Sequence, residues 1–586
     1  MKLNNKYILI CSIFLIYGCQ SKKSQFDIQS EKVTEIIKES SAAIQVKEYF
    51  PDSDVREELH HEFEAFYADR GYSLAWLSFD EPLEQTDQLL KAMSEAHKEG
   101  LDPNSYRIVE IEELRDNLFK EKSRKEARQE NKARVSKNET IATEAKAQDT
   151  LRLNNLARLD FLLTSTYLTY ASHLLNGKIN PGEKEEWFSK PREADFSAHL
   201  ADAIQAKNIE ASLMDLVPKN KAYAQLKQSL ATYREIPAES WKALHGQVDL
   251  KAGDRGSEVL TLKKRLVATG DLDAALITSA DSIVFTPGLV DALKKYQVRH
   301  GLEENGKLNP QTLGSLTVLL QARMEQIMLN MERMRWLPDN FGEKYVLVNI
   351  PDYRLKLVEG EKTTLEMKVI VGKEYNATPI FSDTMEYVVF SPTWTVPLSI
   401  ASEEMLPKIK KDPNYLQKNN LTIYDGWDKD AAPLDPKKVD WKKIDAEEFN
   451  YKIVEAPGRA NSLGRIKFMF PNSLAIYLHD TPAGHLFERS DRSFSHGCIR
   501  VEKPVALAEY LLKDKGWDEP KIQEAMQQEE PEEVLLSEKL PVHLVYWTAW
   551  VGEDGSLQFR EDIYKHDQKQ QRARDVKDKE LLSVVK

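Results

Sequence analysis

The stretch "RSFSHGCIRV", Arg492 to Val501, places a cysteine between a His-Gly pair and an Ile-Arg pair. The chain has 586 residues but only 3 cysteines, and the other two lie within its first 19 residues. A cysteine nucleophile needs a base or a positive field nearby to form a thiolate. Three histidines, His479, His485 and His496, lie close to Cys498 in the sequence. The stretch therefore predicts a reactive thiol, with a buried core residue as the alternative.

The N-terminus indicates export. Two lysines precede an apolar core of eleven residues, 7–17, and Gly18 stands before Cys19. This order is typical of a secretory signal, and the core is shorter than the roughly 20 residues that a membrane span requires. "Ile-Tyr-Gly-Cys" resembles a bacterial lipobox, which implies that residues 1–18 are a signal peptide and that Cys19 carries lipid. An ordinary signal peptide or an uncleaved anchor is the alternative.

Length and charge narrow the class of protein. At about 150 residues per domain, the chain is expected to have three or four domains. The net charge of −13 argues against nucleic acid as a partner, because a phosphate-binding surface needs clustered lysine and arginine. The sequence has neither of the glycine-rich motifs that bind nucleotide phosphates. Nucleotide chemistry is therefore not expected.

The first half of the chain has the pattern of helices. Residues 19–50 are polar and predict a tether, and residues 51–245 predict a helical domain interrupted by a charged insertion at 120–148. Two apolar stripes at helical spacing predict its core: Leu59, Phe63, Phe66 and Tyr67, then Leu156, Leu159, Leu163, Tyr167, Tyr170 and Leu174.

Residues 249–319 predict a small three-helix unit. Its order of helix, helix, Gly-containing turn and helix resembles the peptidoglycan-binding domain of bacterial wall enzymes. The resemblance rests on Tyr296-Gln297, Asn305-Gly306 and Pro310-Gln311-Thr312. A plain three-helix spacer is the alternative.

Beyond a helix expected at about 317–335, the spacing of apolar residues changes from that of helices to that of strands. Residues 340–550 predict a mainly-β domain, because runs rich in Val, Ile and Tyr are bounded by Gly and Pro. Residues 405–452 interrupt it with charged, proline-containing sequence, which we interpret as a lid-like insertion beside a site. Residues 551–586 are expected to be a C-terminal tail. The fold class is thus multidomain α+β.

The segment "LHDTPAGHLFERSDRSFSHGCIRV" resembles the signature of the YkuD-type L,D-transpeptidases, with 498 − 479 = 19 residues from histidine to cysteine. Spacing alone does not decide which histidine is the base. The resemblance implies that Cys498 is the nucleophile, that His479 is the base and that the backbone carbonyl of Asp480 orients it. It also implies an oxyanion hole of backbone N–H groups around Gly497 and Cys498, where glycine lets a substrate approach closely.

Two further residues are expected to support this site. His496, two residues before Cys498, would polarise or shape it. Arg500 would anchor the loop or a substrate carboxylate, with a structural ion pair as the alternative.

The resemblance extends over most of the chain. "SPTWTVP", "APGRANSLGRIKFMFPN", "FYADRGYSLAW" and "GLDPNSY" are similar to the large YcbB-like branch, which joins a helical scaffold domain, a peptidoglycan-binding domain and a catalytic domain with an inserted subdomain. In that branch a tryptophan and a tyrosine line the substrate site, which implies roles for Trp394 and Tyr477. Core packing is the alternative for both aromatics.

The function implied is that of a periplasmic, membrane-anchored lipoprotein enzyme that forms 3→3 cross-links between peptidoglycan stem peptides and needs no cofactor. Enzymes of wall synthesis are further candidate partners, and a carbapenem is the expected covalent inhibitor. Three alternatives stay open: an L,D-carboxypeptidase of the same fold, a non-catalytic wall-binding lipoprotein, and a zinc site using the histidines and the cysteine. No HExxH pattern accompanies the last.

Overall fold

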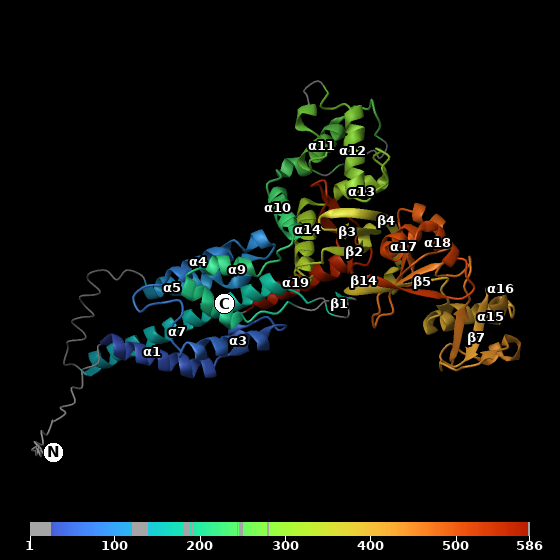
Figure 1. Ribbon diagram of the computed structural model, residues 1–586. Coiled ribbons are helices and arrows are strands. Elements are labelled where there is room, and N and C mark those ends of the chain that lie inside the picture. The colour runs from blue at the N-terminus through green and yellow to red at the C-terminus, as the bar shows by residue number, and fades with distance from the viewer. Residues whose placement is uncertain are drawn as a thin grey trace, which may run out of the picture.

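The computed structural model describes residues 25–119, 139–180, 182, 187–188, 192–242, 244, 250–277 and 281–583. Figure 1 shows a helical domain, a β domain beside it, a small helical unit above the β domain, and a further small subdomain at the far end of the β domain. The signal peptide expected at 1–18, the lipidation site expected at Cys19 and most of the expected charged insertion lie outside the described residues. None of the helices in the described ranges is long and apolar enough to cross a bilayer.

Eight helices build the first domain: α1 (Gln25–Ala42), α2 (Val46–Tyr49), α3 (Arg56–Asp69), α4 (Glu84–Ser94), α5 (Ile108–Phe119), α7 (Glu139–Asn176), α8 (Phe196–Ala206) and α9 (Ile209–Asp215), among the described residues. Every residue of the two apolar stripes predicted from the sequence is buried in its core. The 18-residue α1 corrects the tether expected over 19–50, because Val33 and Ile37, one turn apart, bury against the same core.

The small unit contains α11 (Ser257–Ala268), α12 (Pro287–Arg299) and α13 (Pro310–Thr317), as the sequence predicted. Gln297 contacts the other residues on which the resemblance of this unit rests. The NH2 group of its side chain donates to Asn305 Oδ1 at 3.0 Å and to Thr312 Oγ1 at 3.0 Å. Its side-chain carbonyl oxygen accepts from Gly306 N at 2.8 Å. Gly306 has φ +64°, and a Cβ there would lie 2.6 Å from Val290. These residues therefore hold the fold of the unit together.

The β domain is built on a ten-stranded sheet. Its strands are β1 (Trp187–Phe188), β2 (Lys344–Asn349), β3 (Arg354–Glu359), β4 (Lys362–Gly372), β5 (Ile380–Phe390), β10 (Ile466–Met469), β11 (Leu478–His479), β12 (Ser493–Ser495), β13 (Ile499–Val501) and β14 (Glu532–Val545). The order is β1-β5-β10-β11-β13-β4-β3-β2-β14, and β14 also pairs with β5, so the sheet closes on itself. Helices α17 (Pro504–Leu512) and α18 (Glu519–Ala525) pack against it.

The insertion predicted at 405–452 is a subdomain with its own core. Its sheet has the order β6-β9-β7-β8, from β6 (Trp394–Thr395), β7 (Leu421–Asp425), β8 (Pro433–Leu434) and β9 (Tyr451–Glu455), and it carries α15 (Leu406–Lys411) and α16 (Tyr415–Lys418). Because β6 pairs with β9, the subdomain begins and ends outside the predicted boundaries. Residues such as Val396, Ile423 and Ile453 are fully buried in it.

Two helices tie the domains together. Helix α14 (Leu320–Arg335) packs with α10 (Lys221–Arg234) and with the hairpin of β15 (Ala549–Val551) and β16 (Leu557–Phe559). Helix α19 (His566–Leu582) runs from the β domain into the helical domain, where Figure 1 places the C-terminus.

Helix α19 and the hairpin correct the tail expected over 551–586. The helix is held by polar contacts: Lys577 Nζ donates to Asp52 Oδ1 at 2.7 Å, and Arg574 Nη2 donates to the Gly100 carbonyl at 2.7 Å. A sequence with so few apolar residues gives no helical stripe, which is why its docking could not be predicted from the pattern.

Candidate active site

The predicted site residues lie on the face of the sheet opposite its hydrophobic core. β11 and β13 are parallel neighbours in which His479 is paired with Arg500. Side chains alternate along a strand, so Tyr477 lies on the same side as His479, and Cys498 on the same side as Arg500. Leu478 and Ile499 point the other way and are fully buried in the core. The alternation thus brings four predicted residues together.

The ring of His479 is oriented by the backbone of the next residue. Only 4% of its surface is exposed, and its Nδ1 lies 2.6 Å from the backbone carbonyl of Asp480. Nδ1 therefore carries the proton and donates it, which leaves the lone pair on Nε2. Burial, together with the positive charge of Arg500, lowers the pKa of His479 to about 3. The imidazole is consequently a neutral base at physiological pH.

Cys498 is half-buried at this face. Burial raises the pKa of its thiol above the ordinary value, while the Tyr477 hydroxyl and the charges of Lys467 and Arg500 lower it. Sγ lies 3.7 Å from the carbonyl of Ala475, a non-glycine residue in left-handed backbone with φ +55°. The resting site thus pairs a neutral thiol with a neutral imidazole, and attack requires a proton transfer between them.

The loop before Cys498 is fixed from both sides. Gly497 has φ +111°, a conformation that favours glycine, and its carbonyl accepts from Thr378 Oγ1 at 2.7 Å. Its N–H donates to Ser495 Oγ at 3.2 Å, and Ser495 Oγ donates to the Cys498 carbonyl at 2.6 Å. The N–H of Gly497, expected in the oxyanion hole, is therefore already engaged. In this structure Gly497 contributes the turn that presents Cys498.

The C-terminal segment supports the same loop. Tyr564 OH donates to the Gly372 carbonyl at 2.7 Å, and Gly372 N donates to Thr378 Oγ1 at 2.9 Å. Thr378 in turn bonds the carbonyl of Gly497. Tyr564, which lies in the segment expected to be a tail, therefore stabilises the turn before Cys498.

His496 lies in the turn that Gly497 makes, outside the flanking strands. Its Nε2 lies 2.6 Å from Glu404 Oε1, and Glu404 belongs to the insertion. The acidic partner sits in a π-helical turn, Ile400–Met405. His496 therefore links the nucleophile loop to the insertion through Glu404, a partner that the sequence did not indicate.

Tyr477 of the β domain and Trp394 of the insertion lie where these two parts of the chain meet. Trp394 opens the insertion as the first residue of β6 and is half-buried. Burial raises the pKa of the Tyr477 hydroxyl, as does Cys498, whereas a contact from the Trp394 side chain lowers it. Tyr477 thus contacts Cys498 on one side and Trp394 of the insertion on the other.

Lys467 is a site residue that the sequence analysis did not name. It lies on β10, paired with His479 of β11, and its Nζ lies 3.9 Å from the centre of the Tyr477 ring. The only sequence signal was the alternation in "GRIKFMF", where Ile466 and Phe468 enter the core and Lys467 takes the other face.

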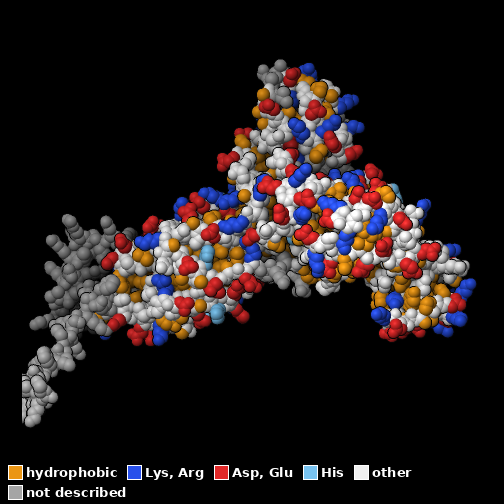
Figure 2. All heavy atoms as spheres, in the orientation of Figure 1, with side chains coloured by type: hydrophobic (Ala, Val, Ile, Leu, Met, Phe, Trp, Pro, Cys, Tyr) orange, Lys and Arg blue, Asp and Glu red, His pale blue; other side chains and the backbone are white. Residues whose placement is uncertain are grey.

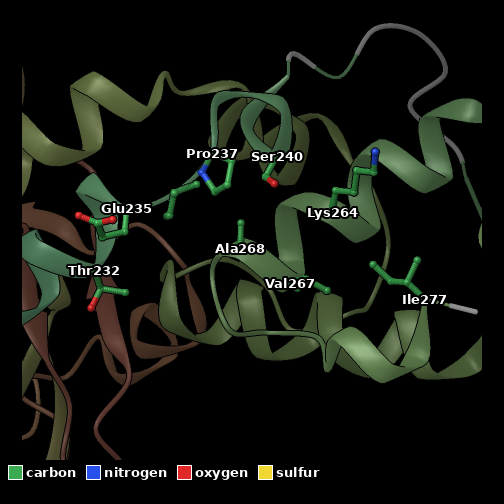
Figure 3. Close-up of a pocket in the computed structure, with 9 residues that line it drawn as sticks. Thr232, Glu235, Pro237, Ser240, Lys264, Val267, Ala268 and Ile277 are labelled. Carbon is green, nitrogen blue, oxygen red and sulfur yellow. The ribbon is translucent and has the colours of Figure 1, made fainter.

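The described residues provide no metal site: no group of three or more His, Cys, Asp or Glu side chains among them is placed to hold a metal ion. On the face seen in Figure 2, acidic and basic side chains are interspersed over the β domain and the insertion. A hollow of about 300 Å³ lies elsewhere, between the end of α10 and α11, lined by residues such as Thr232, Ser240, Lys264 and Val267 (Figure 3). No cysteine or histidine lines it.

Three family models match the chain. Residues 61–230 match "Scaffold domain", residues 255–316 match "Putative peptidoglycan binding domain", and residues 343–522 match "L,D-transpeptidase catalytic domain" of the YkuD type. The β14 strand, which closes the sheet, lies beyond the third match.

One curated relative and one solved structure complete the comparison. The chain is 37% identical over 262 residues to a protein of Haemophilus influenzae named "Putative L,D-transpeptidase", covering 44% of this chain and 52% of the relative. The match thus spans about half the length of that relative. The L,D-transpeptidase (residues 123–326) of Xylanimonas cellulosilytica matches at 15% identity over 51% of this chain and 99% of its own, with a TM-score of 0.17, too low to carry an argument.

Proposed function

We propose that this chain, which belongs to the YkuD-type L,D-transpeptidases, forms 3→3 cross-links in peptidoglycan through a thioester on Cys498. One observation carries the proposal: Cys498 and His479 lie on one face of two adjacent parallel strands, with the imidazole held through Nδ1 by the Asp480 carbonyl at 2.6 Å. This is the nucleophile, base and orienting group that acyl transfer by a thiol requires.

In the first step the donor is a tetrapeptide stem. His479 Nε2 takes the thiol proton as Cys498 Sγ attacks the carbonyl of the L-centre of the diamino acid. The tetrahedral intermediate collapses when the C–N bond to the terminal D-Ala breaks, and the imidazolium returns the proton to the departing amine. The oxyanion needs N–H donors, and with Gly497 engaged by Ser495 we assign the N–H of Cys498 to this role.

In the second step the side-chain amine of an acceptor stem attacks the thioester. His479 accepts the amine proton, the C–S bond breaks, and the proton passes back to the thiolate. If water attacks instead, the product is a tripeptide and the enzyme is an L,D-carboxypeptidase. The insertion that reaches His496 through Glu404 favours exclusion of water during this step.

We further propose that the enzyme acts outside the cytoplasm as a lipoprotein anchored through Cys19, which is supported by the signal-like residues 1–18. The three-helix unit at 255–316 would hold the enzyme on the wall polymer. Replacement Cys19→Ser is expected to move the protein from the membrane fraction to the soluble fraction. Unchanged fractionation would contradict the anchor.

Product analysis tests the cross-linking activity. The enzyme is incubated with a disaccharide-tetrapeptide, and the products are separated and weighed by mass spectrometry beside those of Cys498→Ala. A dimer with stoichiometric release of D-Ala, absent with the variant, is the expected result. Tripeptide alone would assign the carboxypeptidase reaction, and neither product would contradict the proposal.

A further inference from the structure

A row of side chains across three strands carries two positive charges on either side of the base. Lys467 on β10 is paired with His479 on β11, and His479 is paired with Arg500 on β13. Paired residues of neighbouring strands point to the same face, so the order across the sheet is cation, imidazole, cation. Cys498 is two residues before Arg500 and shares this face.

Neither cation has an acidic partner among the described residues. Lys467 makes no ion pair or hydrogen bond there, and its Nζ contacts the ring face of Tyr477. Arg500 likewise makes none, and its Nε is a buried nitrogen without a hydrogen-bond partner. Burial lowers the pKa of both groups, so the site holds them charged against a desolvation cost. A partly buried charge without a partner favours an anion nearby.

The charge that acts on both Lys467 and Arg500 is that of Cys498, but the raised pKa of its thiol keeps Cys498 neutral at rest. His479 is neutral, and the Tyr477 hydroxyl has a raised pKa. Of the two nearby carboxylates, Glu404 is engaged by His496, and that of Asp480 accepts the backbone N–H of Arg465 at 2.8 Å.

We propose that Lys467 and Arg500 form an anion subsite that binds a carboxylate of the acyl donor beside Cys498. That the carboxylate belongs to a stem peptide rests on the proposed function, whereas the preference for an anion does not. A tetrapeptide stem ending in D-Ala carries a terminal carboxylate a few bonds from the attacked carbonyl, so a cation on each side of the base would align that carbonyl with Sγ.

The test compares two alkylating reagents that differ in charge. Iodoacetate is an anion and iodoacetamide is neutral, and both react with the same thiolate. The rate at which each modifies Cys498 in the full-length protein is followed by mass spectrometry of the peptide that contains Cys498. The ratio of the two rates cancels any change in the pKa of the thiol, because that change slows both reagents equally.

In the wild-type protein, the iodoacetate-to-iodoacetamide ratio is expected to exceed that of a free cysteine peptide and to fall as salt is added. Lys467→Met should lower the ratio about fivefold, and Arg500→Met by a similar factor, as expected for loss of one charge a few ångströms away. Lys467→Arg should restore it. A wild-type ratio no higher than that of the peptide overturns the subsite without requiring any variant to fold.

Lys513→Met is the matched control. Lys513 also places its Nζ over a tyrosine ring of the same domain, 4.6 Å from the centre of Tyr510, but away from Cys498. Its ratio should equal that of the wild type. An equal fall in Lys513→Met and Lys467→Met would mean that net charge acts at a distance, which contradicts a local subsite.

The outcome separates this inference from the proposed function. An elevated ratio without any dimer or tripeptide from a stem peptide would keep the anion subsite and reject the transpeptidase. Dimer formation with a ratio equal to that of the free peptide would keep the transpeptidase and reject the subsite.

Discussion

Two groups of cations in the molecule have opposite surroundings. On α14, Arg335 is only 1% exposed and donates to Glu332 Oε2 at 3.0 Å and to Tyr223 OH at 2.7 Å, while Arg333 is fully buried and donates to Asp567 Oδ1 at 2.5 Å. At the active site, Lys467 and Arg500 have no acidic partner among the described residues. The paired cations lie where α14 meets its neighbouring helices, whereas the unpaired cations lie beside Cys498.

The comparison predicts that site variants lose activity without losing stability, whereas α14 variants lose stability first. The largest effect is expected for Cys498→Ala, because without the thiol no thioester can form. Turnover of the stem peptide should fall by more than about 10³-fold with an unchanged melting temperature. Residual turnover within tenfold of wild type would contradict Cys498 as the nucleophile.

Replacement of the base is expected to have the next largest effect. His479→Gln removes the acceptor of the thiol proton, so the acylation rate at neutral pH should fall by about 10²–10⁴-fold. Raising the pH should partly rescue the variant, because the thiol then ionises without a base. Single-turnover acylation measured against pH checks this, and a variant that shows no pH rescue would argue for a different role of His479.

Arg335→Met tests the paired side of the comparison. Removing one member of a buried ion pair leaves Glu332 uncompensated, and the free energy of unfolding should fall by about 3–5 kcal/mol. The exposed pair of Arg354 and Glu366, 3.6 Å apart, provides the control Arg354→Met, with an expected loss below about 1 kcal/mol. Lys467→Met, which removes an unpaired cation, should not destabilise the protein. Denaturation by urea measures the free energy of unfolding of all three variants. Equal losses in the three would contradict the distinction between paired and unpaired cations.

The pH dependence of stability follows from His479. Its pKa falls from 6.5 to about 3 on folding. Below pH 6.5 the unfolded protein therefore binds a proton at His479 that the folded protein does not bind, and the free energy of unfolding decreases as the pH falls. Between about pH 7.5 and about pH 5 the wild type should lose up to about 2 kcal/mol more than His479→Gln. Parallel curves for the two proteins would show that His479 is not held neutral by the fold.

The smallest effect is expected at the contact between His496 and Glu404. Both side chains are partly exposed, so Glu404→Gln should change stability by about 1 kcal/mol or less. Because Glu404 joins the insertion to the nucleophile loop, KM for the stem peptide should rise while kcat changes little. Asp412→Asn breaks a surface pair with Lys418 in the same insertion and should leave KM unchanged. A shift of KM in both variants would argue against a specific contact.

Much of the site could be predicted because its information is local. Tyr477 and His479, and likewise Cys498 and Arg500, are two residues apart, and alternation along a strand places each pair on one face. The resemblance to a known family supplied the choice of base. Lys467 could not be placed, because its position depends on which strand pairs with β11 and in which register.

The helices at the two ends of the chain escaped prediction for a different reason. Helix α1 buries little beyond Val33 and Ile37, and α19 is held through Arg574 and Lys577, whose partners Gly100 and Asp52 are hundreds of residues away. Hydrophobic periodicity detects apolar faces, so it overlooks a helix that docks through buried polar contacts.

The most direct test of the account is the mass of the intact protein after incubation with a carbapenem, measured for the wild type and for Cys498→Ala. The account predicts that one equivalent of the intact drug adds to the wild type, that peptide mapping locates it on Cys498, and that the variant gains no mass. An adduct on both proteins, or on neither, would contradict the assignment of Cys498 as an acylated nucleophile.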